Sequence, residues 1–152
     1  FKCFIMQPVI IRVNRNIKPT YPKWVKKIMN PELELAGPGQ YDLQKVVLYR
    51  HVTQRNGASL YGTLLYNHLI NTNELSSCLN LQDGYAIRKK GIKVYDKLYG
   101  PQDLFLWGSV VEDKLGNLKV PYLYPVTNER VVVRWLCLAN LWYKWFPAAQ
   151  LR

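Results

Sequence analysis

The sequence has few acidic residues, few histidines and few cysteines, and it has no long hydrophobic run. Its apolar stretches are all interrupted within about ten residues, whereas a helix needs about 20 apolar residues to cross a bilayer. We therefore expect a protein without a transmembrane segment. The motifs GxGxxG, GxxxxGK[ST] and HExxH are also absent, so the sequence gives no sign of a dinucleotide site, a P-loop or a zinc protease site.

The three cysteines, Cys3, Cys78 and Cys137, lie far apart in the sequence and form no CxxC pair. This pattern argues against a disulfide framework and a cysteine-based zinc site, and it favours a reducing compartment, so we expect a cytoplasmic protein. A single Cys3–Cys78 or Cys78–Cys137 bridge is the alternative if the protein is exported. The acidic residues are scattered, and we expect neither a metal site nor a cofactor.

The charge of the chain is strongly positive and unevenly distributed. It has 21 basic and 10 acidic residues, a formal net charge of +11. Residues 1–30 contain no acidic residue, and their basic side chains are Lys2, Arg12, Arg15, Lys18, Lys23, Lys26 and Lys27. A second basic concentration is YAIRKKGIKVYDKLYG, residues 85–100. Such a distribution gives part of the surface a positive field, which suits phosphates, an acidic protein or an acidic lipid surface.

The composition is that of a globular chain, with 49% hydrophobic residues in 152, and we expect one domain over residues 1–152. The predicted class is α+β. We expect a strand at residues 9–13, a short helix from Thr20 to about Met29, and a helical middle at about residues 59–99. A C-terminal antiparallel meander of three strands should follow.

Several shorter segments have their own predicted structure. Residues 31–36 should form one helical turn, and residues 43–52 a strand. Ser59 should cap a helix whose apolar face is Tyr61, Leu64, Leu65, His68 and Leu69. The basic stretch should form one helix over residues 82–99. Gly91 falls in its apolar stripe, where a glycine is explained by the close approach of another backbone.

The meander is predicted from three strand-like runs at residues 104–112, 118–126 and 130–138. Pro121 lies within the middle run and has no N–H to donate, so it indicates a sheet edge or a bulge. The tail that follows the third run, LWYKWF, should close over the sheet.

The basic helix is the strongest functional candidate. Lys89, Lys93 and Lys97 are spaced i, i+4, i+8 and would form one ridge, with Arg88 and Lys90 beside it. Such a ridge can neutralise several phosphates. The alternative is that these side chains only solvate the outer face of a helix whose other face is core.

The aromatic residues are a second candidate. Stacking of nucleobases, or binding of a sugar or peptide, could use Trp107, Tyr122, Tyr124, Trp135, Trp142, Tyr143 and Trp145. Alternation within the predicted strands points many of these rings to one sheet face, so we expect most of them in the core. Exposed members of the LWYKWF tail would mark a partner surface.

Evidence for catalysis is weak. His51 and His68 are the two histidines, and Cys78 is the natural nucleophile to pair with one of them. No local signature supports such a dyad, and His68 lies on a predicted apolar helix face. These three residues are therefore weak catalytic candidates.

The sequence as a whole favours a non-enzymatic binding protein whose leading ligand is DNA or RNA. The predicted contacts are on the basic helix and the basic N-terminal segment: Arg88, Lys89, Lys90, Lys93, Lys97, Lys23, Lys26 and Lys27. One alternative is a protein-interaction or assembly module with an acidic protein partner. The second alternative is a small hydrolase or nuclease.

Overall fold

The computed structural model describes residues 7–152 and confirms the α+β class. The α-helices are α1 (Val52–Arg55), α2 (Gly62–Asn71), α3 (Leu81–Lys90) and α4 (Ile92–Tyr99). Short 3-10 helices are η1 (Pro31–Leu33), η2 (Leu43–Lys45), η3 (Leu75–Ser77) and η4 (Trp107–Ser109). The strands are β1 (Ile10–Arg12), β2 (Val25–Ile28), β3 (Gln40–Asp42), β4 (Val47–Tyr49), β5 (Leu60–Tyr61), β6 (Leu104–Phe105), β7 (Val111–Asp113), β8 (Leu118–Val126), β9 (Arg130–Cys137), β10 (Leu141–Trp142) and β11 (Ala148–Gln150).

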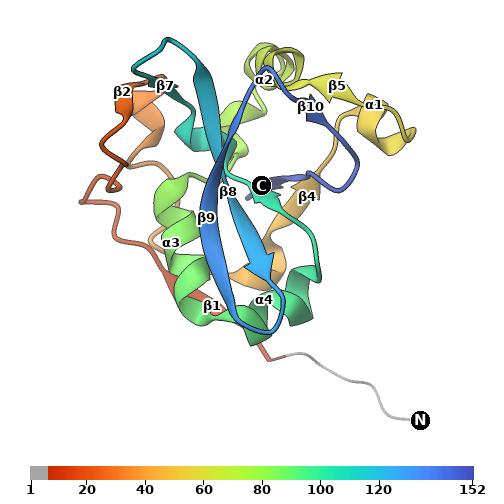
Figure 1. Cartoon of the computed structure of the whole chain (residues 1–152). Helices are drawn as coiled ribbons and strands as arrows, with labels where there is room; N and C mark the ends of the chain where they lie inside the picture. The colour runs from red at the N-terminus through yellow and green to blue at the C-terminus, as the bar shows by residue number, and fades with distance from the viewer. Residues whose placement is uncertain (1–6) are drawn as a thin grey trace.

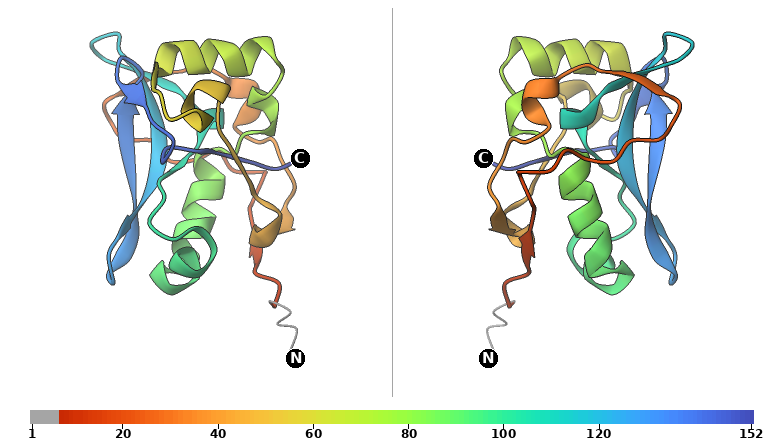
Figure 2. Two further views of the ribbon diagram at one scale, coloured as in Figure 1. Left: turned by 90° about the vertical axis from the view of Figure 1, so that its right-hand side faces the viewer. Right: turned by 90° about the vertical axis from the view of Figure 1, so that its left-hand side faces the viewer.

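The main sheet has seven strands in the order β2-β7-β8-β6-β11-β4, with β9 paired to the outer side of β8. Its pairs are antiparallel except β11–β6, which is parallel. Two small ribbons, β1–β3 and β10–β5, complete the strands. Helices α3 and α4 lie between the long β8–β9 hairpin and the β1–β3 ribbon (Figure 1, Figure 2). No helix within residues 7–152 has the length and apolar character that a bilayer crossing requires.

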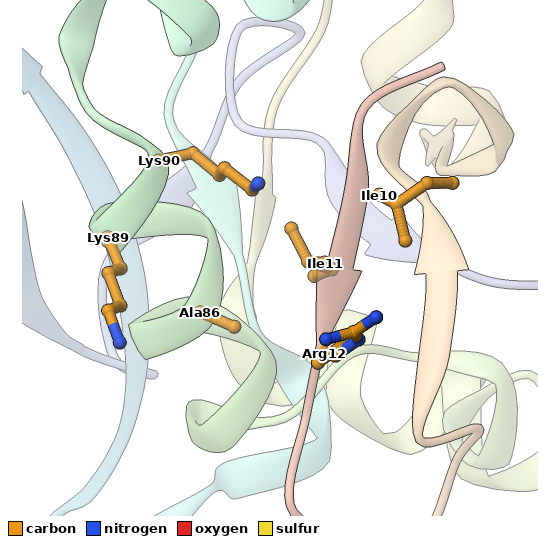
Figure 3. A pocket seen from close by; sticks show the side chains of 6 residues that line it. All are labelled: Ile10, Ile11, Arg12, Ala86, Lys89 and Lys90. Atoms are coloured by element: carbon orange, nitrogen blue, oxygen red, sulfur yellow. The ribbon is translucent and has the colours of Figure 1, made fainter.

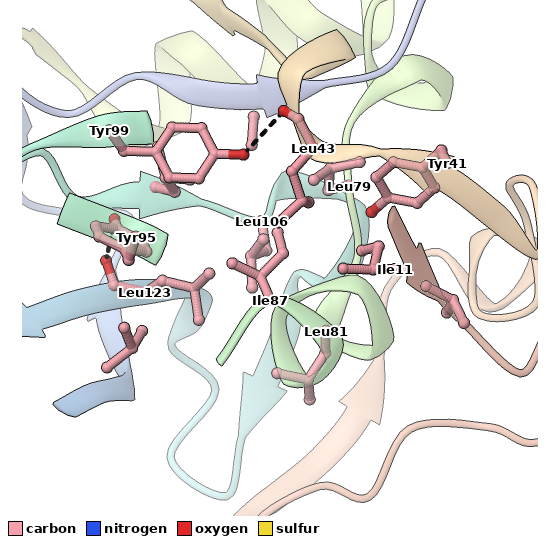
Figure 4. Packing of buried hydrophobic residues seen from close by; sticks show 14 residues of the cluster. Ile11, Tyr41, Leu43, Leu79, Leu81, Ile87, Tyr95, Tyr99, Leu106 and Leu123 are labelled. Atoms are coloured by element: carbon pink, nitrogen blue, oxygen red, sulfur yellow. Dashed lines mark hydrogen bonds between the residues drawn. The ribbon is translucent and has the colours of Figure 1, made fainter. Parts of the chain in front are cut away.

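The core has two parts. One lies around α3 and α4, where Ile87, Tyr95 and Tyr99 pack with Ile11 of β1 and Leu123 of β8 (Figure 4). This cluster joins the β1–β3 ribbon to the main sheet through the two helices. The other part lies under α2 and is rich in aromatic rings, including Phe105, Trp107 and Trp142. These three rings are fully buried, and their large apolar area makes them main contributors to this part of the core.

Several predicted elements are confirmed. β1 lies within the strand expected at residues 9–13, and η1 lies within the turn expected at residues 31–36. The C-terminal meander is formed by β7, β8 and β9. The strand expected at residues 104–112 is not continuous, because η4 divides it into two short strands, β6 and β7. Pro121 lies opposite this gap: its carbonyl accepts from Leu106 N at 2.9 Å, so its missing N–H would face the side where the paired strand is interrupted.

The prediction of a short helix from Thr20 to Met29 was wrong, because Val25–Ile28 within this range form β2, which pairs with β7. The pairing register shifts between Val25 and Lys27, which marks a β-bulge. The bulge leaves Lys26 and Lys27 both exposed while Val25 and Ile28 are both half-buried. A spacing of three between apolar residues therefore imitates the period of a helix.

Two further predictions need correction. Helix α2 begins at Gly62 rather than at Ser59, because Leu60 and Tyr61 pair with β10. Its buried face is Gly62, Leu65, Tyr66 and Leu69, whereas Tyr61 and Leu64 are exposed. A Cβ on Gly62 would lie 2.3 Å from a ring carbon of Trp142, so the helix packs through the glycine, which hydrophobic periodicity does not register.

The strand expected at residues 43–52 is confined to β4. Before it, the carboxylate of Asp42 accepts from Gln44 N at 3.0 Å and turns the chain into η2. After it, the imidazole of His51 caps α1. Side-chain acceptors at both ends thus limit the strand to three residues.

Candidate nucleic-acid interface

The basic stretch forms two helices rather than one. Gly91 has φ of +94° and ψ of 170°, a conformation that is essentially restricted to glycine, and it separates α3 from α4. A Cβ placed on Gly91 would meet no atom within 4 Å. The close backbone approach expected at this glycine was therefore wrong, and the glycine instead ends α3 and begins α4. The ridge of Lys89, Lys93 and Lys97 is divided at this point.

The predicted basic residues lie in three places: on α3, on α4 and at β2, the last of which is described below. Lys89 and Lys90 lie in the last turn of α3, and Lys93 and Lys97 are exposed on α4. Arg88 stands over the ring of Tyr85 at 4.8 Å from its centroid, an arrangement typical of a cation–π contact.

The basic N-terminal segment packs along α3. The Tyr85 hydroxyl donates to the carbonyl of Thr20 at 2.6 Å, and the Gln82 side chain donates to the carbonyl of Ile17 at 3.1 Å. Closer to β1, Arg15 donates to Asp83 at 2.7 Å. These contacts hold the segment that follows β1 against the helix, and they bring part of the first basic concentration next to the second.

A groove of about 480 Å³ lies between β1 and α3 (Figure 3). Its lining is Ile10, Ile11, Arg12, Ala86, Lys89 and Lys90. The side chain of Lys90 extends from the helix toward β1, and Ile11 points back toward the helix (Figure 3). None of these described lining residues is acidic. The hollow is thus lined by apolar side chains and by cations that come from both β1 and α3.

The groove cations have no carboxylate partner within the described part of the chain. The ion pairs found there are Arg15–Asp83, Lys26–Glu112, Lys119–Asp113 and Arg152–Glu74. Arg12 donates through Nε to the neutral amide oxygen of Gln40 at 3.2 Å. This contact orients the guanidinium without cancelling its charge. An anion in the groove would therefore meet uncompensated positive charge on both walls.

Lys23, Lys26 and Lys27 lie elsewhere. Lys26 and Lys27 belong to β2, Lys23 precedes that strand, and β2 lies at the end of the molecule away from α4 (Figure 1). Lys26 is 3.9 Å from a carboxylate oxygen of Glu112. The structure consequently does not bring these three lysines to the groove.

The two histidines lie together. The rings of His51 and His68 meet edge to face with centroids 4.6 Å apart. His51 Nδ1 accepts from the backbone N–H of Thr53 at 3.1 Å, so this imidazole serves as the N-cap of α1. His68 Nε2 is 3.0 Å from the hydroxyl of Tyr49. Burial lowers the pKa of His51, with smaller contributions from His68 and Arg55.

Cys78 has different partners. Its Sγ is 3.5 Å from the carbonyl of Glu74 and 3.5 Å from Nε2 of Gln150, and neither partner is a histidine. Burial raises the pKa of the Cys78 thiol to about 12, so the group is protonated at neutral pH. Cys78 and Cys137 are both free thiols, so the Cys78–Cys137 bridge is not formed, and Cys3 lies outside the described residues. The geometry gives no thiolate–imidazole pair.

Residues 7–152 contain no group of three or more His, Cys, Asp or Glu side chains arranged to hold a metal ion.

The aromatic candidates divide by burial. Trp107 and Trp142 are fully buried, Tyr122, Tyr124 and Trp135 are half-buried, and Tyr143 and Trp145 in the tail are exposed, so two of the seven lie fully in the core.

Arg12 is not among the contact residues predicted from the sequence. Arg12 is one of several basic residues near the N-terminus, and the sequence contains no pattern that links it to Lys89 and Lys90. The alternation Ile10, Ile11, Arg12 gives a partial signal, because it places Arg12 on the face opposite the buried Ile11.

No family model matches the chain, and neither a curated protein nor a solved structure matches it at a significant level.

Proposed function

We propose that this protein binds nucleic acid through the sugar–phosphate backbone, in the groove between β1 and α3. The observation that carries the proposal is the meeting of Arg12 with Lys89 and Lys90 around one hollow that has no acidic residue among its described lining. The two walls come from segments more than 70 residues apart in the sequence. Their convergence supports a binding surface over a merely solvated helix face.

The competing explanation is that Lys89 and Lys90 only stabilise the end of α3. Basic residues in the last turn of a helix interact favourably with the negative end of its dipole. This explains the lysines but not Arg12, which lies on a strand and is held by Gln40 with its charge directed to the surface. A ligand with several negative charges accounts for all three cations together.

The proposed mechanism is electrostatic capture. Lysine and arginine side chains that neutralise phosphates release the counterions of the nucleic acid, so affinity falls steeply with salt. The exposed Ile10 of β1 offers apolar contact to the sugar edges. The described lining residues include no Asn, Gln, Asp or Glu side chain that could read adenine or cytosine edges, so the proposal is binding without strong sequence preference. It includes a cytoplasmic location, where thiols remain reduced.

The test compares two triple variants with equal loss of charge. Arg12→Ala/Lys89→Ala/Lys90→Ala empties the groove of cations, whereas Lys23→Ala/Lys26→Ala/Lys27→Ala removes three cations from the region of β2. Affinity for a fluorescent duplex DNA is measured by anisotropy over a range of salt concentrations. We expect the groove variant to bind much more weakly and its log–log salt slope to fall by about 0.9 for each phosphate contact removed.

The β2 variant should retain most of the affinity. Equal losses in the two variants would show a response to net charge alone and would overturn the assignment to the groove. Repeating the titration with a single-stranded RNA separates the two nucleic acids, and competition by polyglutamate tests the acidic-protein alternative. Binding of fluorescent polyglutamate by a protein that binds neither DNA nor RNA would replace nucleic acid with an acidic protein partner.

A further inference from the structure

A second basic hollow lies on another side of the molecule and contains an exposed tryptophan. It has a volume of about 440 Å³ and is lined by Arg50, Arg55, Gln102, Lys144 and Trp145. None of these described lining residues is acidic, and none lines the groove between β1 and α3. The volume is within the range of roughly 300–1,000 Å³ that is usual for small-ligand sites.

Arg50 carries the strongest indication of an anion site. Its guanidinium is half-buried and donates to the side-chain oxygen of Gln102 and to the backbone carbonyl of Lys144. Both acceptors are neutral. Burial lowers the pKa of Arg50, and no carboxylate opposes this effect. A charge held partly out of water without a counter-ion is costly, and a bound anion would offset that cost.

The aromatic part of the hollow is also prepared for a ligand. Trp145 is 53% exposed, and its ring stacks on Tyr143 with centroids 5.0 Å apart and planes within 8°. One face of Trp145 is thus backed by a second ring. Proteins that bind nucleic acid with little sequence preference combine aromatic rings, on which the base stacks, with basic side chains that pair with the phosphate. An exposed indole face next to cations offers the same combination.

The buried side chain of Gln54 fixes the aromatic part and the basic part of the hollow relative to each other. Gln54 of α1 is fully buried, and its Nε2 donates to the carbonyl of Tyr143 at 2.7 Å and to that of Phe146 at 3.1 Å. The turn that carries Trp145 is therefore fixed to the helix that carries Arg55. Such preorganisation lowers the entropy cost of binding.

We infer that this hollow binds a nucleoside phosphate, with the base stacked on Trp145 and the phosphate held by Arg50, Arg55 and Lys144. Inorganic phosphate alone would leave the aromatic stack unused, and a neutral sugar would leave three cations unused. The same chemistry is offered by a free mononucleotide and by the terminal nucleotide of a strand. The inference does not depend on the groove, because the residues are different.

The experiment measures binding by calorimetry to adenosine monophosphate, adenosine, inorganic phosphate and a 5′-phosphorylated single-stranded oligonucleotide. The oligonucleotide is titrated into the Arg12→Ala/Lys89→Ala/Lys90→Ala protein, so that its binding reports on this hollow. We expect the monophosphate to bind at least tenfold more tightly than adenosine or phosphate. Tighter binding of the oligonucleotide than of the monophosphate would identify a strand end as the natural source, and the reverse would identify a free nucleotide.

The variants separate stacking from charge. Trp145→Ala should weaken binding roughly tenfold or more, as expected for loss of one stacked base, whereas Trp145→Phe should retain most of it. Arg55→Ala/Lys144→Ala should also weaken binding tenfold or more. Its matched control, Lys23→Ala/Lys114→Ala, removes two exposed cations elsewhere and should have little effect. All four substituted cations are exposed, so the folds should be preserved.

A local readout accompanies the affinities. The indole N–H signal of Trp145, assigned by its absence in Trp145→Phe, should shift when the monophosphate is added. Equal affinities in the Arg55/Lys144 variant and its control would overturn the inference, as would equal affinities in Trp145→Ala and the wild type. An absence of nucleotide binding would overturn it as well, and it would leave the groove proposal untouched.

Discussion

Arg15 and Asp83 form a two-pronged ion pair, with Nη2–Oδ1 at 2.7 Å and Nη1–Oδ2 at 3.3 Å. Their side chains are 12% and 3% exposed. Asp83 also accepts from the Tyr41 hydroxyl at 2.7 Å and from Asn80 N at 3.0 Å. Asp83 lies on the same face of α3 as Ala86 and Lys90, at i, i+3 and i+7. The pair therefore ties the segment that follows β1 to α3, and so connects the two elements that form the groove.

Loss of this pair should be costly. Asp83→Asn leaves the Arg15 guanidinium buried beside a neutral amide, and we expect the free energy of unfolding to fall by about 3–5 kcal/mol. Urea denaturation followed by circular dichroism measures the change. The matched control is Glu112→Gln, which removes the exposed partner of Lys26 and should cost at most about 1 kcal/mol. Similar losses in the two variants would contradict a stabilising role specific to the buried pair.

Gly91 provides a test of the break between α3 and α4. Because its backbone conformation is strained for any residue with a Cβ, we expect Gly91→Ala to lower the free energy of unfolding by about 1–3 kcal/mol. A continuous helix would give the opposite sign, since alanine is favoured over glycine within a helix by up to about 1 kcal/mol. Thermal and urea denaturation distinguish the two signs. Gly39→Ala is the control, because its Cβ would meet only the carbonyl of Val13 at 3.7 Å.

The capping histidine should make stability depend on pH. The pKa of His51 is lower in the folded protein than its ordinary value of 6.5, so the unfolded chain binds more protons. The free energy of unfolding should therefore decrease as the pH falls through about 6.5 toward the lower folded pKa. Protonation at Nδ1 would also remove the acceptor for Thr53 N.

His51→Asn keeps a side-chain acceptor at the N-cap and removes the titration. Urea denaturation between pH 7.5 and 5 should show a smaller decrease for this variant than for the wild type. Parallel curves for the two proteins would show that His51 does not carry the pH dependence, and would leave the remaining decrease to other groups.

Cys78 should react slowly despite being a free thiol. Its raised pKa leaves very little thiolate at pH 8, and the thiolate is the reactive form. Iodoacetamide labelling of the native protein, followed by peptide mass mapping, should leave Cys78 largely unmodified, while labelling in urea should be complete. Rapid native labelling of Cys78 would contradict the buried environment and would restore a nucleophile to the hydrolase alternative.

The class of the fold and several elements follow from local pattern, because strands and helices with one buried face repeat with periods of two and 3.6. The failures have physical causes that a local pattern does not contain. The bulge in β2 gives Val25 and Ile28 a helix-like spacing. Gly62 is part of a buried face because Trp142, 80 residues later, packs against it. Gly91 fits a helical stripe by position and breaks the helix by conformation.

The candidate sites were only partly predictable for a related reason. Charge density identified Lys89 and Lys90, but their partner Arg12 is set by the packing of β1 on α3. The hollow at Trp145 gathers its five lining residues from four places in the sequence, positions 50, 55, 102 and 144–145, and each is ordinary in its own local context. Of these residues, only those in the LWYKWF tail were predicted from the sequence to mark a partner surface. Tertiary convergence of this kind leaves no spacing that a single sequence can display.

The position of β11 in the main sheet bears on how the protein folds. β11 pairs with β4 on one side and with β6 on the other, so residues 47–49, 104–105 and 148–150 must meet before the sheet is continuous. These contacts span large separations in sequence, and topologies of this kind fold slowly because long loops must close first. A chain released from the ribosome before Ala148 would expose the unpaired edges of β4 and β6. β11 thus joins two strands that precede it in the sequence by about 100 and about 43 residues.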